Sequence, residues 1–308
     1  MTNVRGVRQQ RGVAVVAAML LAALTTVLVG SLVYSQHLLV AELENHANLT
    51  QSWWIDEAGI EWAKIILDED QKSGPVDHLQ ETWAKVLPVT AVEGGEVTGS
   101  IEDAQRLFNL NNLQDAAKGL DRQSIFGRML GRLDLPHELA ATLSDWIDAD
   151  SIETANGGAE DDYYLGLSPP YRAANQPLTE MGNLYRIKGF DNAAVDKLSG
   201  LATVLPERTP VNVNTAPPDV LLSVLDGADL ADVQTLIASR NVAWFTDVGD
   251  FAKRIAGGTM KFDENSISVN SNYFLVTCNA RFGRANSRMQ ALIVRRGGRP
   301  LTVWKRFG

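Results

Sequence analysis

An uncharged apolar run near the N-terminus constrains this chain more than any other feature of its sequence. Residues 13–35 read VAVVAAMLLAALTTVLVGSLVYS, 23 residues without a charge, and the next acidic residue is Glu42. A segment of this length spans a bilayer. In hydrocarbon the backbone must satisfy its own hydrogen bonds, so a lone spanning segment is a helix. Arginines flank it only on the N-terminal side, at Arg5, Arg8 and Arg11, which predicts a cytoplasmic N-terminus and an external remainder.

The helical pattern continues beyond this run. Apolar residues recur at spacings that favour one helical face as far as Leu67, and three of them are Trp53, Trp54 and Trp62. A secretory signal would instead show a shorter apolar core followed by a small-residue cleavage site. The sequence therefore predicts a transmembrane helix over residues 13–36, continued outside the membrane over residues 37–70.

The rest of the chain has the composition of a folded, acidic protein. Of its 308 residues 45% are hydrophobic and 21% charged, and 28 basic side chains stand against 37 acidic ones. Three of the basic residues precede the apolar run, so the remainder is more acidic still. Such a body repels phosphate backbones, which disfavours nucleic acid as a partner. Cys278 is the single cysteine, so an intrachain disulfide is excluded.

The spacing of apolar residues changes along the body of the chain and predicts an α+β fold. The expected sheet comes from residues 71–107 and 266–308, and a large helical domain over residues 108–265 is inserted in it. The sheet is antiparallel and packs on the outer half of the N-terminal helix. Helical patterns cover residues 121–133, 137–147, 217–225, 230–239 and 247–255; strand patterns cover residues 96–102, 266–280, 284–296 and 300–307, with turns at Gly283 and Gly297-Gly298.

Six carboxylates gather within eighteen residues of the helical block. Such a group is repulsive unless a cation neutralises it. No His or Cys lies in this stretch, which argues against zinc and copper, whereas calcium binds oxygen ligands in irregular loops. The spacing is not that of an EF-hand, and a solvated acidic loop is the alternative. The six are Asp145, Asp148, Asp150, Glu160, Asp161 and Asp162.

Other candidate sites carry weaker signals. Residues 211–240 resemble a helix-hairpin-helix module, but the hairpin LDGADL at residues 225–230 adds two carboxylates where a phosphate would approach, so we interpret it as a packing unit. Cys278 lies in an apolar run, and no serine elbow, phosphate loop or metalloprotease helix is present. We therefore predict that the chain is not an enzyme. The four histidines show no ligand spacing: His37, His46, His78 and His137.

The junction QRGV at residues 10–13 resembles the type IV prepilin signal, in which a short basic leader ends in Gly and a long apolar helix follows. The resemblance implies that prepilin peptidase cuts between Gly12 and Val13, removing residues 1–12, and that the new N-terminus is methylated. In most of that family the fifth mature residue is Glu; here it is Ala17. The resemblance implies that the glutamate pairs with the terminal amine of a neighbouring subunit, because an unpaired carboxylate in hydrocarbon is costly. A subunit that has no other subunit ahead of it in the fibre does not need this glutamate.

Four motifs in the body, in this order, are similar to those of the K-type minor pseudopilin of the type II secretion system. The resemblance implies a pilin-like sheet interrupted by a helical domain, and a subunit at the pseudopilus tip. It also implies structural calcium, with Asp150, Glu160, Asp161 and Asp162 as preferred ligands and Asp148 next, whereas Asp145 is expected to cap or face solvent. The motifs are SDWIDAD at residues 144–150, GGAEDDYY at 157–164, PPYRAAN at 169–175 and VNVNTAP at 211–217.

The resemblance further implies partners and a location. The expected partners are I- and J-type minor pseudopilins, prepilin peptidase and the bacterial inner membrane, with the C-terminal domain in the periplasm and export across the outer membrane as the purpose. Two alternatives remain open. One is a minor pilin of a type IV pilus, and the other is a membrane-tethered DNA-binding protein built on the hairpin module.

Overall fold

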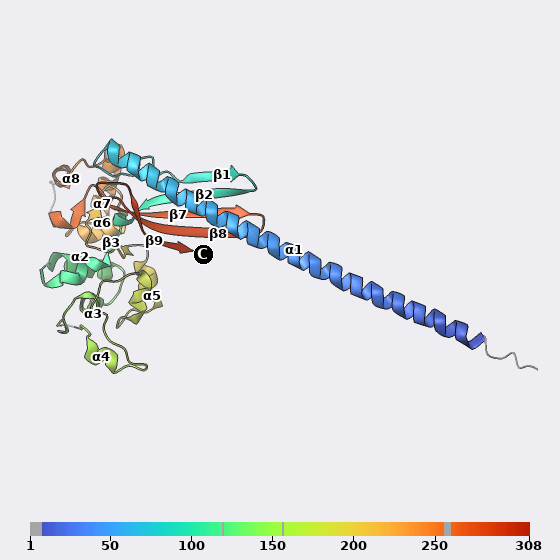
Figure 1. Cartoon of the computed structure of the whole chain (residues 1–308). Helices are drawn as coiled ribbons and strands as arrows, with labels where there is room; N and C mark the ends of the chain where they lie inside the picture. The colour runs from blue at the N-terminus through green and yellow to red at the C-terminus, as the bar shows by residue number, and fades with distance from the viewer. Residues whose placement is uncertain (1–7, 119, 156, 256–259) are drawn as a thin grey trace, which may run out of the picture.

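One helix dominates the computed structural model, which describes residues 8–118, 120–155, 157–255 and 260–308. Helix α1 (Arg8–Ser73) has 66 residues, hence a length of about 100 Å. Its N-terminal half projects alone, and its C-terminal half lies against a sheet (Figure 1). It runs three residues past the predicted end at residue 70 and stops before Gly74-Pro75, because the residue preceding a proline disfavours helical geometry.

The sheet has five antiparallel strands in the order β1-β2-β7-β8-β9. This confirms the predicted α+β class, with strands from both ends of the chain in one sheet (Figure 1). Strand β1 was missed by the sequence patterns because it is a mostly exposed edge strand that contains Pro88. The strands are β1 (Leu87–Val92), β2 (Gly95–Asp103), β7 (Tyr273–Phe282), β8 (Ala285–Val294) and β9 (Leu301–Phe307).

Helix α1 packs on the two central strands of this sheet. Ile60 and Leu67 of α1 are fully buried against Phe274 of β7 and Ile293 of β8. The helix approaches β7 so closely that a Cβ on Gly59 would lie 2.6 Å from the Cys278 Sγ. Cys278 is therefore part of this core, and burial raises the pKa of its thiol to about 12, as expected for an inert cysteine.

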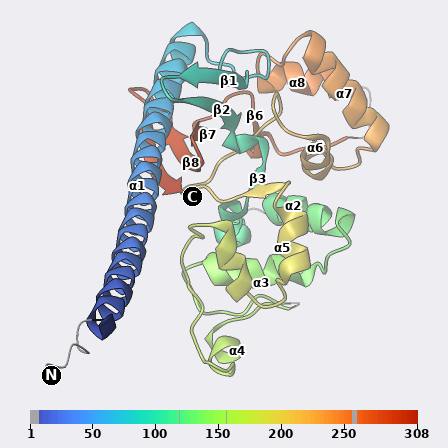
Figure 2. The same cartoon turned by 90° about the vertical axis from the view of Figure 1, so that its right-hand side faces the viewer.

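The segment between β2 and β7 forms a second, mostly helical body with its own core (Figure 2). Two short parallel strand pairs close its two halves: β3–β4 joins residues 108–109 to 202–203, and β5–β6 joins residues 211–212 to 267–268. Its elements are η1 (Ala104–Arg106), β3 (Phe108–Asn109), η2 (Leu110–Lys118), α2 (Leu120–Arg132), α3 (Glu138–Ile147), α4 (Asp161–Leu165), η3 (Met181–Arg186), α5 (Asn192–Leu198), β4 (Ala202–Thr203), β5 (Val211–Asn212), α6 (Pro218–Val224), α7 (Leu230–Val242), α8 (Val248–Ile255), η4 (Glu264–Ser266) and β6 (Ile267–Ser268).

Candidate functional site

Aromatic packing brings the two halves of the acidic stretch together. Asp148 is the C-cap of α3, and Glu160 is the N-cap of α4. The ring of Trp146, at the end of α3, meets that of Tyr164 in α4 edge to face, with centroids 5.0 Å apart. Both rings are largely buried, so the loop of residues 148–160 must fold back and place its two ends side by side.

Three carboxylates converge at this point. One oxygen each from Asp148, Asp150 and Glu160 lie within 4.8 Å of one another. The Asp148 Oδ1 and both Glu160 carboxylate oxygens are buried and have no hydrogen-bond partner within the protein. Buried carboxylate oxygens without donors are strongly destabilising unless a cation or a proton compensates them. The oxygen-only ligand set and the orphaned buried oxygens fit calcium.

The electrostatics of this group point the same way. The pKa of Glu160 rises to about 7, first through burial and then through the charges of Asp145, Asp148 and Asp150. The pKa of Asp148 rises to about 6, first through burial and then through the charges of Asp150 and Asp145. Both shifts show that burial and mutual repulsion disfavour the ionised carboxylates, a cost that a bound cation would offset.

Asp145 has a different part in the same loop. It is fully buried, and its carboxylate accepts hydrogen bonds from the backbone N–H groups of Thr154 and Ala159, at 3.1 and 2.8 Å. A Cβ on Gly158 would lie 2.2 Å from the Asp145 Oδ2, so glycine is required there. Of the two roles expected for Asp145, capping or facing solvent, the second is wrong, because its buried carboxylate anchors the loop that carries Glu160.

Two of the expected ligands lie outside the converging group. The Asp161 carboxylate accepts a hydrogen bond from the Ala173 N–H at 3.0 Å and lies 3.6 Å from the Arg172 Nη1. Asp162 is exposed at the first turn of α4. Neither Asp161 nor Asp162 is therefore among the carboxylates whose oxygens converge here.

Asn175 is a candidate ligand that sequence reasoning missed. Its Oδ1 is buried without a partner, and its Nδ2 donates to the Asp150 carbonyl at 2.7 Å. Its backbone is left-handed, with φ of 46°. An amide oxygen is a ligand that calcium accepts. The signal was available, since Asn175 ends the motif at residues 169–175.

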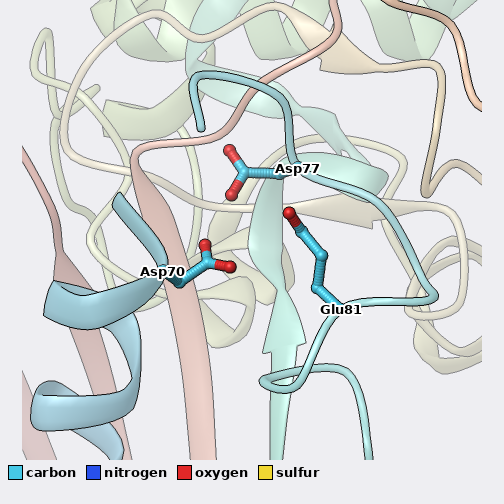
Figure 3. A group of neighbouring side chains, drawn as sticks. All are labelled: Asp70, Asp77 and Glu81. Carbon is cyan, nitrogen blue, oxygen red and sulfur yellow. The ribbon is translucent and has the colours of Figure 1, made fainter. Parts of the chain in front are cut away.

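A second acidic group has its own donors. Asp70, Asp77 and Glu81 point toward one another where α1 ends (Figure 3). Arg295, at the end of β8, donates to the Asp70 Oδ2 at 2.6 Å and to the Asp77 Oδ1. The Glu81 Oε2 accepts from the His78 N–H and the Trp83 Nε1. These contacts identify the group as a joint between α1 and the sheet.

The VNVNTAP motif at residues 211–217 is a hydrogen-bonding hub. The Asn212 Nδ2 donates to the Asp103 Oδ2 at 3.0 Å, and the Thr215 hydroxyl donates to the same oxygen at 2.6 Å. Asn214 exchanges two hydrogen bonds with the backbone of Phe245. Burial raises the pKa of Asp103, which is nearly inaccessible to solvent. The motif ties the helical body to the end of β2.

The hairpin of the helix-hairpin-helix-like unit carries carboxylates in the place where that module binds phosphate. Asp229 accepts from the Asp232 N–H at 2.8 Å, and the Asp232 carboxylate accepts from the Asp229 N–H at 3.0 Å. The two acids thus occupy the N-terminus of α7, which an anion would need. Of the histidines, His78 stacks on Trp244 with ring centroids 3.8 Å apart, and the metal-compatible groups among the described residues contain no histidine.

The predicted processing residues Gly12 and Val13 lie inside α1, before Ala17. Among the described residues, Gly12–Ser73 is the stretch long and apolar enough to cross a membrane, and its most apolar window has a mean hydropathy of 2.5 with none of it buried. An uncovered apolar surface of this kind indicates an anchor in lipid.

Comparison with known proteins gives consistent matches. Two family models match, both described as type II secretion system (T2SS), protein K, over residues 106–207 and 211–270. Curated relatives named type II secretion system protein K include one from Pseudomonas aeruginosa, 32% identical over 93% of this chain and 88% of its own. Another, from Klebsiella pneumoniae, is 30% identical over 97% of each chain.

A solved structure is similar over most of the chain. It is the crystal structure of the GspK-GspI-GspJ complex from the type 2 secretion system of enterotoxigenic Escherichia coli, with a TM-score of 0.76 and 26% identity, covering 87% of this chain and 99% of that one. The relatives are named for a secretion system, and no catalytic activity is part of those names. By its sequence, its fold and these matches, the chain belongs to the type II secretion system protein K family.

Proposed function

We propose that this chain is the tip subunit of a pseudopilus, anchored in the bacterial inner membrane by one helix and assembled there with I- and J-type minor pseudopilins. The observation that carries the proposal is the unbroken helix α1, which joins an apolar anchor to a pilin-like sheet. The solved relative that matches so much of this chain was crystallised together with GspI and GspJ. The role is structural rather than catalytic.

Ala17 supports the tip position. A subunit that joins a fibre from below needs a carboxylate to pair with the terminal amine of the subunit above it, and an unpaired charge in hydrocarbon is costly. This chain has alanine at position 17 and therefore lacks the carboxylate. At the tip of the fibre no subunit lies above it, so no terminal amine is left unpaired in the membrane. The helix then enters the membrane with its N-terminus in the cytoplasm and the sheet in the periplasm.

Assembly is tested with the full-length chain in membranes. We expect it to co-purify with the I- and J-type subunits of the same bacterium after detergent extraction, and we expect its deletion to abolish export while other membrane proteins remain normal. A deletion strain that secretes normally and builds normal fibres contradicts the proposal.

Processing is tested separately by N-terminal sequencing of the protein extracted from membranes. Cleavage between Gly12 and Val13 by prepilin peptidase yields a chain that begins at Val13. An intact Met1 in a strain with active peptidase excludes prepilin-type maturation. A strain that lacks the peptidase serves as the control and should retain residues 1–12.

Calcium is the proposed structural ion, held by Asp148, Asp150 and Glu160 with Asn175 as a further oxygen ligand. The support is the set of buried oxygens without donors. We expect calorimetric titration of the chelator-treated chain to detect calcium binding, and Asp148→Asn with Glu160→Gln to abolish it. Asp162→Asn, which changes an exposed carboxylate outside the group, is the matched control and should leave binding within about twofold, since water and salt screen a charge at an exposed position.

A further inference from the structure

Two turns of the sheet lie on the side of the membrane anchor. The β7–β8 turn reaches α1 at Asn48, where a Cβ on Gly283 would lie 2.8 Å from the Asn48 Nδ2. The β1–β2 turn reaches α1 at Gln51, whose Nε2 donates to the Glu93 carbonyl at 3.1 Å. Both turns point along α1 toward its N-terminal half, whereas the helical body lies at the other end of the sheet (Figure 1). We call the end that carries these two turns the anchor end.

Lipid headgroups lie within reach of the anchor end. The predicted span closes at residue 36, and the stretch without Asp, Glu, Lys or Arg closes at Ala41, so Asn48 lies about 10–18 Å beyond the hydrocarbon along the helix axis. The stretch of residues 13–41 is about 44 Å long, which exceeds the hydrocarbon core of about 30 Å and favours a tilted helix, and tilt shortens this distance. Headgroups fill about 5–8 Å of it, and their charge acts over about 8 Å more.

The outer face of the sheet, opposite α1, carries a polar hollow of about 330 Å³ at the anchor end. The strand register places neighbouring side chains of a row about 5 Å apart at Cβ. The helical body covers only the other end of this face, at Tyr273 and Leu292, so the residues of the hollow on β7 and β8 named here are exposed. The two rows across β2, β7 and β8 are Thr98, Asn279 and Arg288, and Glu96, Arg281 and Asn286.

The positive charges of this end are not all compensated. Arg281 pairs with Glu96 at 2.8 Å. Arg288 in the hollow and Arg284 in the β7–β8 turn are exposed, and within the described part of the chain neither forms an ion pair. Like charges on neighbouring strands repel one another, so an anion at this place would be stabilising.

The donors in the hollow match a phosphate group. A guanidinium binds two phosphate oxygens at once, and amide and hydroxyl groups add single hydrogen bonds. The Arg288 guanidinium has the Asn279 amide beside it in its row, and the Thr98 hydroxyl follows. Among the lining residues Glu96 is the acidic side chain, and it already has a partner in Arg281.

The position of the hollow favours a lipid phosphate over a soluble anion. The chain carries a net charge of -9, so an anion in solution is repelled by most of the molecule. The anchor instead holds the basic end of the sheet toward the membrane surface and keeps it there. Anionic phospholipids attract basic groups that lie next to a transmembrane helix.

We propose that the anchor end binds headgroups of anionic phospholipids, through Arg284 and Arg288, in the membrane that holds α1. This inference rests on the membrane anchorage in the proposed function. It adds a contact that holds the sheet against the membrane surface before the subunit leaves the membrane for a fibre.

Photo-crosslinking to lipid tests the contact. The full-length chain is placed in nanodiscs of phosphatidylglycerol and phosphatidylcholine, with benzoylphenylalanine at position 286 in the hollow or at position 298 in the turn between β8 and β9, at the other end of the sheet. We expect mass spectrometry to find a lipid adduct at position 286 and none at position 298. Nanodiscs of phosphatidylcholine alone should lower the adduct at position 286 at least about fivefold, because their surface has no net charge.

Charge substitutions supply a second measurement. Arg284→Gln combined with Arg288→Gln should lower the adduct at position 286 at least about fivefold in the nanodiscs that contain phosphatidylglycerol. Arg299→Gln is the matched control, because it removes an exposed arginine at the other end of the sheet, and it should leave the adduct unchanged. Thermal melting of both variants checks that the chain still folds.

Each other result overturns the inference. An adduct that is independent of lipid charge and of the two arginines would mean that the anchor alone brings lipid near. No adduct at position 286, or an equal one at position 298, excludes a lipid site in the hollow. A probe at position 286 that crosslinks only to protein in bacterial membranes assigns this surface to a protein partner. In all of these cases the chain is anchored and the proposed function stands, whereas a chain that does not insert into nanodiscs at all overturns both.

Discussion

Asp56 is a buried carboxylate at the contact between α1 and the sheet. Its Oδ2 accepts a hydrogen bond from the Ser287 hydroxyl at 2.6 Å, while its Oδ1 is buried without a partner. Burial raises its pKa to about 6, and the hydrogen bond from Ser287 offsets only part of the rise. A carboxyl whose pKa is higher in the folded than in the unfolded state binds more protons when folded, so stability falls as pH rises.

Asp56→Asn should therefore stabilise the chain at pH 8 by about 1–2 kcal/mol, because the neutral amide avoids the cost of a buried charge. The difference should shrink as pH falls through about 6 and disappear below about pH 4, where the carboxyl is protonated in both the folded and the unfolded state. Thermal melting across this pH range measures it. A constant difference between variant and native protein at all pH values would show that Asp56 does not titrate in this way.

Gly158 offers a second test at the residue scale. A Cβ there would lie 2.2 Å from the Asp145 Oδ2 and 2.6 Å from the Thr154 carbonyl, so Gly158→Ala should destabilise the loop by about 1–3 kcal/mol and weaken calcium binding. Gly200→Ala is the control, since a Cβ at that position meets nothing within 4 Å. Equal melting temperatures for the two variants contradict the assigned role of the Asp145 anchor.

At the scale of elements, Arg295 joins the end of α1 to the end of β8. It is 5% exposed, and its guanidinium also lies 4.7 Å from the centre of the Phe274 ring. Burial and the charge of Arg295 act in opposite directions on Asp77, and burial dominates, so the pKa of Asp77 rises to about 6. The joint thus depends on a cation that cannot be removed without leaving buried carboxylates behind.

Arg295→Met should lower the free energy of unfolding by about 3–5 kcal/mol, because Asp70 and Asp77 then remain buried and unpaired. Arg281→Met breaks an ion pair with Glu96 on the exposed face of the sheet and should cost less than about 1 kcal/mol. Unfolding transitions of the two variants, measured side by side, give the comparison. Similar losses in both would mean that the Arg295 joint is not structural.

On the scale of the whole molecule, charge is strongly segregated along the chain. Residues 266–308 contain eight basic side chains and no acidic one, and all 37 acidic residues lie between Glu42 and Glu264. In the folded chain, basic side chains of the C-terminal strands form ion pairs with acidic residues far away in the sequence. These ion pairs connect the C-terminal strands to α1 and to the helical body. The pairs beyond the Arg295 joint are Arg281–Glu96, Arg296–Glu207, Lys305–Glu57 and Arg306–Glu180.

The two bodies should respond differently to the loss of calcium. The converging carboxylates belong to the core that includes Trp146 and Tyr164, whereas the sheet has a separate core with α1. We expect a chelator to speed hydrogen exchange at residues 148–175 while exchange in β7 and β8 stays unchanged. Faster exchange throughout the chain would mean that the ion stabilises the whole molecule rather than one body.

Much of the fold followed from local patterns in the sequence. The apolar run, the helical spacing beyond it and the return to alternation after residue 266 predicted α1, the helical insertion and strands β7, β8 and β9. Strand β1 escaped because an exposed edge strand carries no apolar alternation. The sequence showed that carboxylates are concentrated in residues 145–162, but it did not show that Asp148 and Glu160 converge while Asp161 lies outside their group, because that depends on the direction of each side chain.

The apolar periodicity, the charge pattern and the leader motif are each carried by residues that are close together in the sequence. The sequence by itself therefore determined the anchor, its expected orientation, the α+β class and the family. Tertiary structure alone decided which carboxylates meet, which arginine joins α1 to β8, and which part of the sheet stays uncovered. These features depend on contacts between residues far apart in the chain. Such contacts are set by how whole elements pack, and no local spacing encodes them.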